Sequence, residues 1–397
     1  MEAIKELQLP EKFDQYDEAR KQGFLKVKAL KEEGTPVVGI FCTYTPMEII
    51  HAAGAAAVGL CGTSDVPIPF AEQHLPKNLC PLIKSSYGFA VSETCPYFYF
   101  SDLIVGETTC DGKKKMYELM GEMKDTHVLH LPQGQDKDHA FRYWREELVL
   151  LKQKLEEKFN IEITDEMLRE EIKKSNEERR ILMEFYELGK LDPSPITGVE
   201  INGTLEALGF QFDRPAQNAL IAERTKELRE KYEKELKGTK TNRPRILVTG
   251  CPVGGVREKV LKTIEDAGAD IVAYENCGGV REKQTLVDET KDPIDALTEK
   301  YLNVSCSVMT PNPRRFEALD NMIDEYKIDG VIEVVLQACH TFAVEAHNVK
   351  KYVTEKKNKP YVYIETDYSK LDLGQIRTRI EAFLEMVKED NTVEAAV

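Results

Sequence analysis

The nine cysteines are the residues of this 397-residue chain whose chemistry stands out. Thiolates bind soft metals and act as nucleophiles, so cysteines can mark a metal centre or a catalytic site. Their number is odd, and the first residues, MEAIKELQLPEKF, lack the apolar core of a secretory signal. We therefore expect a cytoplasmic protein with reduced thiols rather than a disulfide framework. The nine are Cys42, Cys61, Cys80, Cys95, Cys110, Cys251, Cys277, Cys306 and Cys339.

Most of these cysteines come at the ends of predicted strands. Five directly follow apolar runs that are typical of buried strands, and Cys277 follows the strand-like IVAYE. Ligands of open α/β sheets bind beyond the carboxyl ends of the strands, so the pattern predicts one shared thiolate site in the cleft between two domains. The alternative, that free cysteines are small buried hydrophobes, would scatter them over strands and helix faces alike. The five are Cys42, Cys61, Cys110, Cys251 and Cys339.

Spacing alone leaves the chemistry of such a site open. Zinc sites usually contain close cysteine pairs, and no two cysteines here are nearer than fifteen positions. The dense cysteine run of bacterial ferredoxins is absent as well, so zinc and an iron–sulfur cluster both remain possible. A nucleophile pair of Cys339 and His340 is disfavoured, because adjacent loop residues rarely face each other. Glycine or proline beside the cysteine in TTCDG, TGCPVGG and ENCGG lets the backbone approach a ligand, but no nucleotide-binding motif is present.

Three stretches of the chain predict the elements that position these thiols. Residues 1–145 contain four short apolar runs bounded by turn residues, and residues 241–390 contain four more that alternate with helical patterns. Residues 146–240 are rich in Lys, Glu, Arg and Leu at helical spacing and predict a helical linking segment. The expected strands cover 36–42, 55–61, 102–110, 126–132, 245–250, 269–275, 330–339 and 360–367.

Alternation of strands and helices is typical of parallel sheets with right-handed crossovers. The predicted fold class is therefore α/β, with two doubly wound, Rossmann-like domains, a helical segment, and the thiolate site in the interdomain cleft. The composition, 42% hydrophobic and 31% charged, is that of an ordinary globular protein. A formal net charge of −15 argues against nucleic acid or an anionic membrane as a partner. No apolar run approaches the roughly 20 residues that span a bilayer.

With these motifs in view, the chain resembles the 2-hydroxyacyl-CoA dehydratase and benzoyl-CoA reductase superfamily over nearly its whole length. The N-terminal part of the resemblance lies in GIFCTYTPMEIIHAAGA, LPKNLCPLIKSSYG and SDLIVGETTCDGKKKMYE. The C-terminal part lies in TGCPVGG, YENCGG, CSVMTPNPRR and VIEVVLQACHTFAVE. More narrowly, the chain is similar to the double-cubane cluster proteins of that superfamily.

The narrower resemblance implies a homodimer in which six thiolates of each chain hold an [8Fe–9S] cofactor, two [4Fe–4S] cubanes joined by a sulfide. Dehydratase subunits of the superfamily hold a single [4Fe–4S] cluster on three cysteines, and the similar positions here are Cys80, Cys110 and Cys339. The three further ligands are expected at Cys42, Cys277 and Cys306. Cys61, Cys95 and Cys251 are left as structural thiols, with Cys251 the first substitute if one choice is wrong.

The resemblance also implies a source of electrons. They come singly from a separate homodimeric ATPase that carries its own [4Fe–4S] cluster, and the missing phosphate loop agrees with ATP being hydrolysed in that partner. Small molecules such as acetylene, azide and hydrazine are the kind of substrate implied. The physiological substrate is not implied.

Other side chains are weaker candidates. His340 is expected to donate a proton or a hydrogen bond at the site, or else to satisfy a loop carbonyl. Glu48 and His51 lie one turn apart on a predicted crossover helix over 45–54, where they line the cavity or are simply solvated. A further set of cations is expected on solvated faces, and the alternative is that they offset cluster charge or dock the acidic rim of the reductase: Lys113, Lys114, Lys115, Arg314 and Arg315.

Two other functions remain open from the sequence. A 2-hydroxyacyl-CoA dehydratase subunit would carry one cubane and act on a CoA thioester, and the extra cysteines argue against it. A maturation or storage protein would bind a cluster or metal without turning over a substrate. Iron content separates the first alternative from the double cubane, and substrate-dependent oxidation of the reduced protein tests the second.

Overall fold

The computed structural model describes residues 18–210 and 212–394. Residues 1–13, on which the absence of a secretory signal rests, lie outside the described part of the chain. The chain forms two compact units. Unit 1 comprises 1–177, 209–212 and 285–304, and unit 2 comprises 178–208, 213–284 and 305–397. In the described residues, no helix combines the length and the apolar character needed to cross a membrane.

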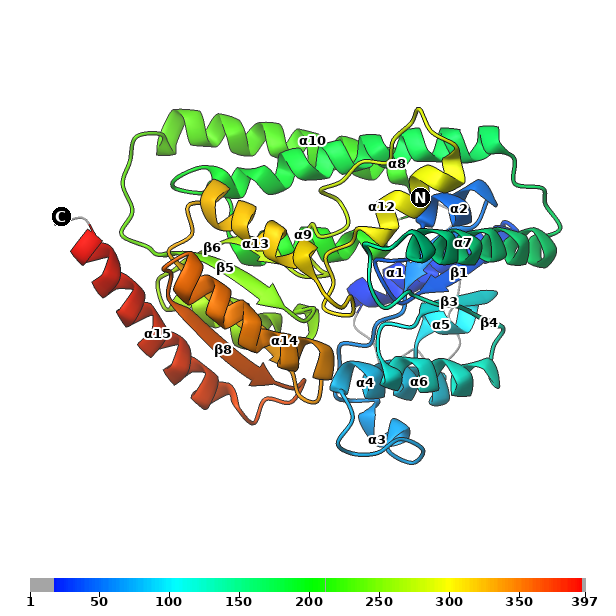
Figure 1. Cartoon of the computed structure of the whole chain (residues 1–397), viewed down its shortest axis with the longest axis horizontal. Coiled ribbons are helices and arrows are strands. Elements are labelled where there is room, and N and C mark those ends of the chain that lie inside the picture. The colour runs from blue at the N-terminus through cyan, green and yellow to red at the C-terminus, as the bar shows by residue number, and fades with distance from the viewer. Residues whose placement is uncertain (1–17, 211, 395–397) are drawn as a thin grey trace. The chain divides into compact units, whose positions relative to one another are not determined.

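Unit 1 is built on a four-stranded parallel sheet with the order β2-β1-β3-β4, of which Figure 1 labels β1, β3 and β4. Its central strand β3 is buried at every residue, which suits the continuous apolar run of a parallel strand covered on both faces. The strands are β1 (Val37–Ile40), β2 (Ala56–Gly59), β3 (Leu103–Glu107) and β4 (Thr126–Leu129). The helices are α1 (Glu18–Glu32), α2 (Met47–Ala52), α3 (Ile68–Ala71), α4 (Pro81–Val91), α5 (Pro96–Phe100), α6 (Asp111–Gly121), α7 (Asp138–Phe159) and α12 (Pro293–Leu302).

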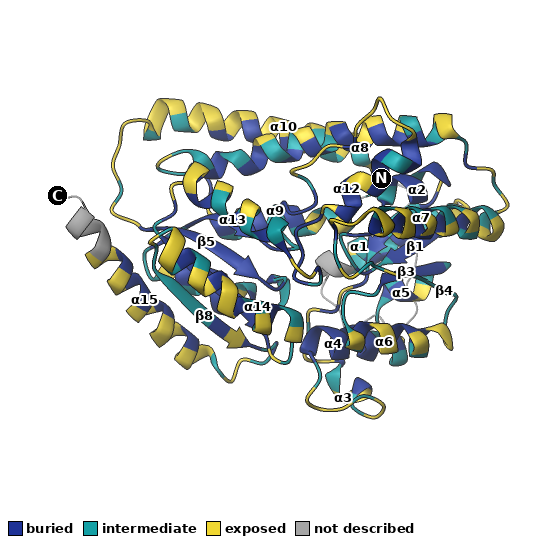
Figure 2. Cartoon of the chain, in the orientation of Figure 1, coloured by how far each residue is buried: buried dark blue, intermediate teal, exposed yellow. Residues whose placement is uncertain are grey.

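Unit 2 repeats the design with the order β6-β5-β7-β8, again parallel. Figure 2 shows β5 as buried along its length, whereas α15 alternates between buried and exposed residues, as a helix covering a sheet does. The strands are β5 (Arg245–Gly250), β6 (Asp270–Glu275), β7 (Gly330–Leu336) and β8 (Tyr361–Thr366). The helices are α9 (Gly198–Ala207), α10 (Arg214–Lys231), α11 (Lys262–Asp266), α13 (Pro313–Glu325), α14 (His340–Lys351) and α15 (Leu373–Glu394).

The predicted fold class is confirmed: two four-stranded parallel sheets with connecting helices form two Rossmann-like units. All eight expected strands are present, trimmed by one to three residues at their ends where they differ. The predicted helical stretch is divided, because α7 belongs to unit 1, α10 belongs to unit 2, and the chain enters unit 2 within α8 (Asp165–Tyr186).

Thr45, just before α2, makes its polar contact with the sheet and not with the helix. It does not cap α2, whose N-cap is Pro46 without a side-chain hydrogen bond. The Thr45 hydroxyl instead donates to the buried carboxyl group of Glu107 on the neighbouring strand β3. A buried carboxyl oxygen without a hydrogen bond is costly, which favours this partner for the hydroxyl. Gly54 follows the end of α2 with a φ of +70°.

Candidate thiolate site

The strand order of each unit marks the place where a ligand would bind. In both sheets the chain reverses its winding direction at the two central strands, and ligands of open α/β folds bind beyond this switch point. In unit 1 the central strands are β1 and β3, which are followed by the loops of Cys42 and Cys110. In unit 2 they are β5 and β7, which are followed by the loops of Cys251 and Cys339. Each switch point is therefore flanked by two thiols.

Several cysteines also occupy helix N-termini, where backbone N–H groups favour a thiolate. Cys80, Cys110 and Cys339 are the N-cap residues of α4, α6 and α14. The amide of Lys113 donates to Cys110 Sγ over 3.4 Å. Cys95 caps the short helix α5, but burial raises the pKa of its thiol to about 11, so it is a neutral thiol at pH 7.

Lys113 joins the cysteine-bearing loops of unit 1. Its side chain is buried, and its ammonium donates to the carbonyl of Phe41, the residue before Cys42, over 3.4 Å. Cys61 Sγ donates to the same carbonyl over 3.0 Å. Burial by itself would lower the pKa of Lys113, but the negative charge that Tyr117, Cys61 and Cys42 can carry outweighs it, and the pKa lies well above its usual range. Lys113 thus places a fixed positive charge among these thiols.

The expectation that all five cations lie on solvated faces is wrong for Lys113. On α6 it shares the buried stripe of Met116, Tyr117 and Met120, which faces the sheet. Its neighbours Lys114 and Lys115 are exposed as expected, and they pair with Asp111 and Glu118 on the outer face of α6.

In unit 2, one buried arginine serves two cysteines. Arg281 donates to Cys277 Sγ over 3.4 Å. Burial raises the pKa of the Cys306 thiol to about 11. The positive charge of Arg281 opposes this rise, and a negative charge on Cys277 contributes to it. Cys277 and Cys306 therefore lie within electrostatic reach of each other and of one guanidinium. Arg281 follows Cys277 by four residues and is a contact that the sequence reasoning missed.

Arg281 is held by a buried ionic network. Its Nε and Nη2 both donate to Glu275 Oε1, over 3.0 and 2.7 Å. Arg315 Nε donates to the other oxygen of Glu275 over 3.0 Å. Burial would raise the pKa of Glu275, but the two guanidiniums outweigh that effect and lower it. The carboxylate is thereby fixed in its charged form between two cations.

Arg315 extends the network and corrects a second prediction. It was expected on a solvated face, yet it is fully buried. Its remaining donors bind Glu333 over 2.9 Å and Glu345 over 2.5 Å. The N-terminal part of α13 turns Arg315 toward the sheet, where carboxylates of three different elements converge on it. Arg314, one position earlier, points outward and pairs with Glu317.

Cys251 lies in a tightly packed backbone environment. It follows Gly250, whose φ of +106° and close approach to the Val334 carbonyl require glycine. The Cys251 amide donates to that carbonyl over 2.8 Å, and the thiol accepts from the Leu336 amide over 3.3 Å. Cys251 is buried and tied to the end of β7, which suits the structural role expected for it.

The non-cysteine candidates lie in unlike surroundings. His340 is the first residue of α14 and is exposed. Glu48 is fully buried on α2 and accepts a hydrogen bond from the hydroxyl of Tyr301 over 2.8 Å. The alternative of a solvated Glu48 is therefore wrong.

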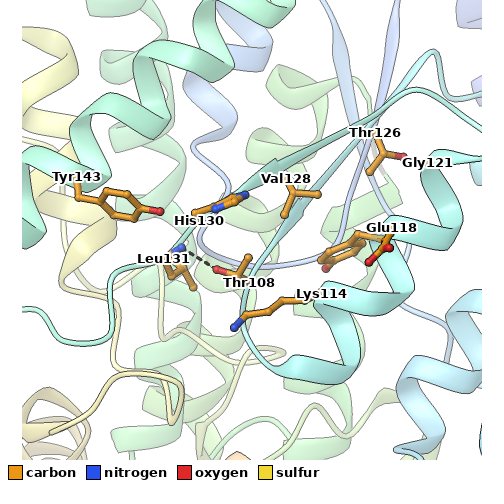
Figure 3. A pocket seen from close by; sticks show the side chains of 10 residues that line it. Thr108, Lys114, Glu118, Gly121, Thr126, Val128, His130, Leu131 and Tyr143 are labelled. Atoms are coloured by element: carbon orange, nitrogen blue, oxygen red, sulfur yellow. Dashed lines mark hydrogen bonds between the residues drawn. The ribbon is translucent and has the colours of Figure 1, made fainter.

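An open pocket of about 610 Å³ lies elsewhere in unit 1. Figure 3 shows its lining side chains, which come from α6, α7, β4 and the segments after β3 and β4, with the Leu131 amide donating to the Thr108 hydroxyl. No cysteine lines it, so this pocket is distinct from the thiols. Its lining residues are Thr108, Lys114, Tyr117, Glu118, Gly121, Thr126, Val128, His130, Leu131 and Tyr143.

The surroundings of the thiols indicate which kind of metal centre they could hold. In residues 18–210 and 212–394, no three His, Cys, Asp or Glu side chains converge closely enough to hold one metal ion. A cluster distributes its thiolates over several iron atoms, so it does not require convergence on a single point. Buried cations and backbone N–H donors at the sulfurs are what an anionic cluster needs around its ligands. The donor set therefore fits an iron–sulfur cluster better than a single zinc ion.

Fold and site together define a class of α/β protein with two parallel sheets and thiols at both switch points. Comparisons with known proteins identify the family. The family model for the 2-hydroxyglutaryl-CoA dehydratase D-component matches residues 42–387, and this chain belongs to that family. Over 380 residues, 96% of this chain and 98% of the other, it is 50% identical to the "Putative dehydratase subunit YjiM" of Escherichia coli K12.

More distant relatives are named as subunits of two kinds of enzyme, a dehydratase and a reductase. The chain is 26% identical to the "(R)-phenyllactyl-CoA dehydratase beta subunit" of Clostridium sporogenes over 90% of this chain and 94% of the other. It is 23% identical to one of the subunits of the benzoyl-CoA reductase of Thauera aromatica, over 89% of this chain and 91% of the other. The family therefore contains subunits of both dehydratases and reductases.

Proposed function

We propose that this chain is an iron–sulfur reductase component that takes low-potential electrons from an ATP-hydrolysing [4Fe–4S] partner and reduces small molecules at an [8Fe–9S] double-cubane cluster. The observation that supports this best is the pairing of thiols with buried cations in both units. Lys113 stands among Cys42, Cys61 and Cys110, and Arg281 stands beside Cys277 and Cys306. A single cubane on three thiols does not account for two such sets.

Six thiolates would hold the cofactor: Cys42, Cys80, Cys110, Cys277, Cys306 and Cys339. When bound, the cluster would supply stored electrons at low potential for transfer to a substrate. The residues of the chain have separate tasks. Lys113 and Arg281 offset the negative charge of the thiolates, and the N-termini of α4, α6 and α14 direct backbone dipoles toward Cys80, Cys110 and Cys339.

The proposed partners follow from the same reading. We propose that the chain forms a cytoplasmic homodimer. Because the sequence contains no phosphate loop, we propose that ATP is hydrolysed by the electron-donating partner. In the proposal, His340 and Glu48 are the candidate proton-handling groups carried over from the sequence. Exposed His340 can exchange protons with solvent, whereas buried Glu48 is held by Tyr301 and would act only within the unit.

Metal analysis of anaerobically purified protein tests the proposal. About eight irons and nine acid-labile sulfides per chain are expected for the double cubane. The reduced protein should then be reoxidised by acetylene, azide or hydrazine when the ATP-dependent partner or a chemical reductant is present. A full cluster that no small substrate reoxidises would favour a storage or maturation role instead.

The second candidate is a 2-hydroxyacyl-CoA dehydratase subunit with one [4Fe–4S] cluster on Cys80, Cys110 and Cys339. The names of the relatives favour it, because one at 50% identity and another at 26% are called dehydratase subunits. About four irons per chain, together with release of water from a 2-hydroxyacyl-CoA, would support this candidate and contradict the double cubane.

A further inference from the structure

Glu107 is a buried carboxyl group that the proposed function has not used. It is the last residue of β3 and is fully buried. Its Oε1 accepts a hydrogen bond from the hydroxyl of Thr45, which lies on the loop after β1. Its Oε2 is buried and has no hydrogen-bond partner within the described residues. A buried carboxylate normally has its oxygens satisfied, so this free oxygen calls for an explanation.

Two side chains of α6 complete the surroundings of Glu107. The Tyr117 ring packs against Gly106, where a Cβ would lie 2.5 Å from its Cζ, and the buried Tyr117 hydroxyl also lacks a partner in the described structure. The charge of Glu107 acts on both Tyr117 and Lys113. The same two side chains are electrostatically coupled to the Cys42 and Cys61 thiols. Glu107 is thus coupled electrostatically, through Lys113 and Tyr117, to the thiol loops of unit 1.

The balance of forces on Glu107 brings the carboxyl close to the middle of its titration at pH 7, so that it carries a proton at lower pH. Burial raises the pKa of the carboxyl to about 7, while the Thr45 hydroxyl and the Lys113 charge oppose that rise. The titratable groups that interact with it are Lys113 and Tyr117 of α6, and these two side chains in turn feel the charges of Cys42 and Cys61 on the loops after β1 and β2. Of these, Lys113 is the cation that would stabilise a Glu107 carboxylate.

We propose that Glu107 is the internal proton donor of the reductase site. Its Oε2 carries the proton, its Oε1 accepts the hydrogen bond of Thr45, and the charge of Lys113 stabilises the carboxylate that remains after proton transfer. The inference rests on the proposed function and deepens it. Reduction of a small unsaturated substrate adds two electrons and two protons. The low-potential iron–sulfur partner supplies the electrons, Glu107 supplies one proton and becomes a carboxylate, and solvent supplies the second proton and later reprotonates Glu107.

Acetylene reduction by the cluster-loaded protein, measured from pH 6 to 9 with a chemical reductant, tests the role of Glu107. Wild-type activity should fall as the pH rises through about 7, because the acid form is lost. Glu107→Gln should lower the rate about a hundredfold below pH 7 and abolish that pH dependence. Thr45→Val should shift the fall to higher pH, because it removes a hydrogen bond that favours the charged form.

The control is Glu282→Gln, which removes a buried carboxylate of unit 2 that pairs with Arg179. It should leave the pH profile in place. A Glu107→Gln protein that binds a full cluster and retains the wild-type rate and profile would overturn the proposal. A Thr45→Val profile identical to wild type would do so too, because a purely structural Glu107 would not respond to that hydrogen bond.

Infrared spectroscopy of the cluster-free protein separates this inference from the proposed function. Because the pKa of Glu265 is also raised to about 7, the signal is read from the wild-type minus Glu107→Gln difference spectrum, where the carbonyl stretch of one protonated carboxyl should be present at pH 6 and diminish at pH 8. If that signal is present but the purified protein neither binds iron nor reduces acetylene, the proposed function fails while the protonation of Glu107 stands. If wild type binds iron and is active but the signal is missing at pH 6, the inference alone fails.

Discussion

The guanidinium of Arg281 donates a hydrogen bond to the sulfur of Cys277 over 3.4 Å, and Glu275 holds that guanidinium from the opposite side. Both residues are set by one short segment, the loop that leaves β6. A hydrogen bond to a cluster-ligating sulfur withdraws negative charge from it and raises the reduction potential of the cluster. The pair therefore connects the ionic core of unit 2 directly to a proposed ligand.

Replacing Arg281 should change both stability and the redox properties of the protein. Arg281→Met removes the hydrogen bond to Cys277 and one of the two cations on Glu275, so the free energy of unfolding should fall by about 3 kcal/mol. The reduction potential of the loaded cluster, followed by EPR during a redox titration, should move to a more negative value. The matched control is Arg179→Met, which breaks an equally buried pair with Glu282 but leaves the potential unchanged. Equal potentials in all three proteins would refute the role of Arg281.

Replacing Arg315 should destabilise unit 2 by an amount that depends on pH. Arg315→Leu leaves the carboxylates of Glu275, Glu333 and Glu345 without their shared cation, which should cost about 3–5 kcal/mol at pH 7.5. In that variant the folded-state pKa values of buried Glu275 and Glu333 rise because the lowering effect of Arg315 is lost, so the folded state takes up protons and the loss shrinks at lower pH. Urea unfolding at pH 5.5 and 7.5 measures this, and a loss that grows on acidification would contradict the assignment.

Single cysteine replacements should sort the thiols into ligands and bystanders. Cys110→Ser and Cys339→Ser should each lower the iron content and abolish small-molecule reduction, because serine is a poor ligand for iron–sulfur clusters. Cys95→Ser is the control, since the Cys95 thiol at the start of α5 is neutral and is not among the proposed ligands. Iron analysis of anaerobic preparations decides the matter. Undiminished iron in both Cys110→Ser and Cys339→Ser would disprove the ligand set.

Gly250 should tolerate no side chain. A Cβ at this position would lie 2.3 Å from the Val334 carbonyl oxygen, in a backbone conformation with φ of +106°. Gly250→Ala should therefore lower the free energy of unfolding by about 1–3 kcal/mol through strain and the separation of β5 from β7. Gly209→Ala, where a Cβ meets nothing within 4 Å, is the matched control and should be nearly neutral in thermal unfolding. Equal melting temperatures for the two variants would show that β5 and β7 adjust without strain.

The sequence by itself determined the eight strands and the placement of six cysteines just beyond them. Strands such as GVIEVVL are continuous apolar runs bounded by glycine and polar residues, and this local signal survives any packing. Alternation with helical segments then required parallel sheets, which the structure has. The loops of Cys42, Cys110, Cys251 and Cys339 follow from that order.

Only the tertiary structure decided which charged residues face the thiols. Lys113 and Lys114 are neighbours of the same type, and Arg314 and Arg315 are as well, yet one of each pair is buried in an ionic or thiol cluster and the other is not. Local sequence cannot separate them, because the outcome depends on carboxylates and carbonyls supplied by distant strands. Glu107 and Arg281 acquired their environments in the same way. The thiols could be read from the chain, whereas the charges that would tune them depend on how each sheet and its helices pack together.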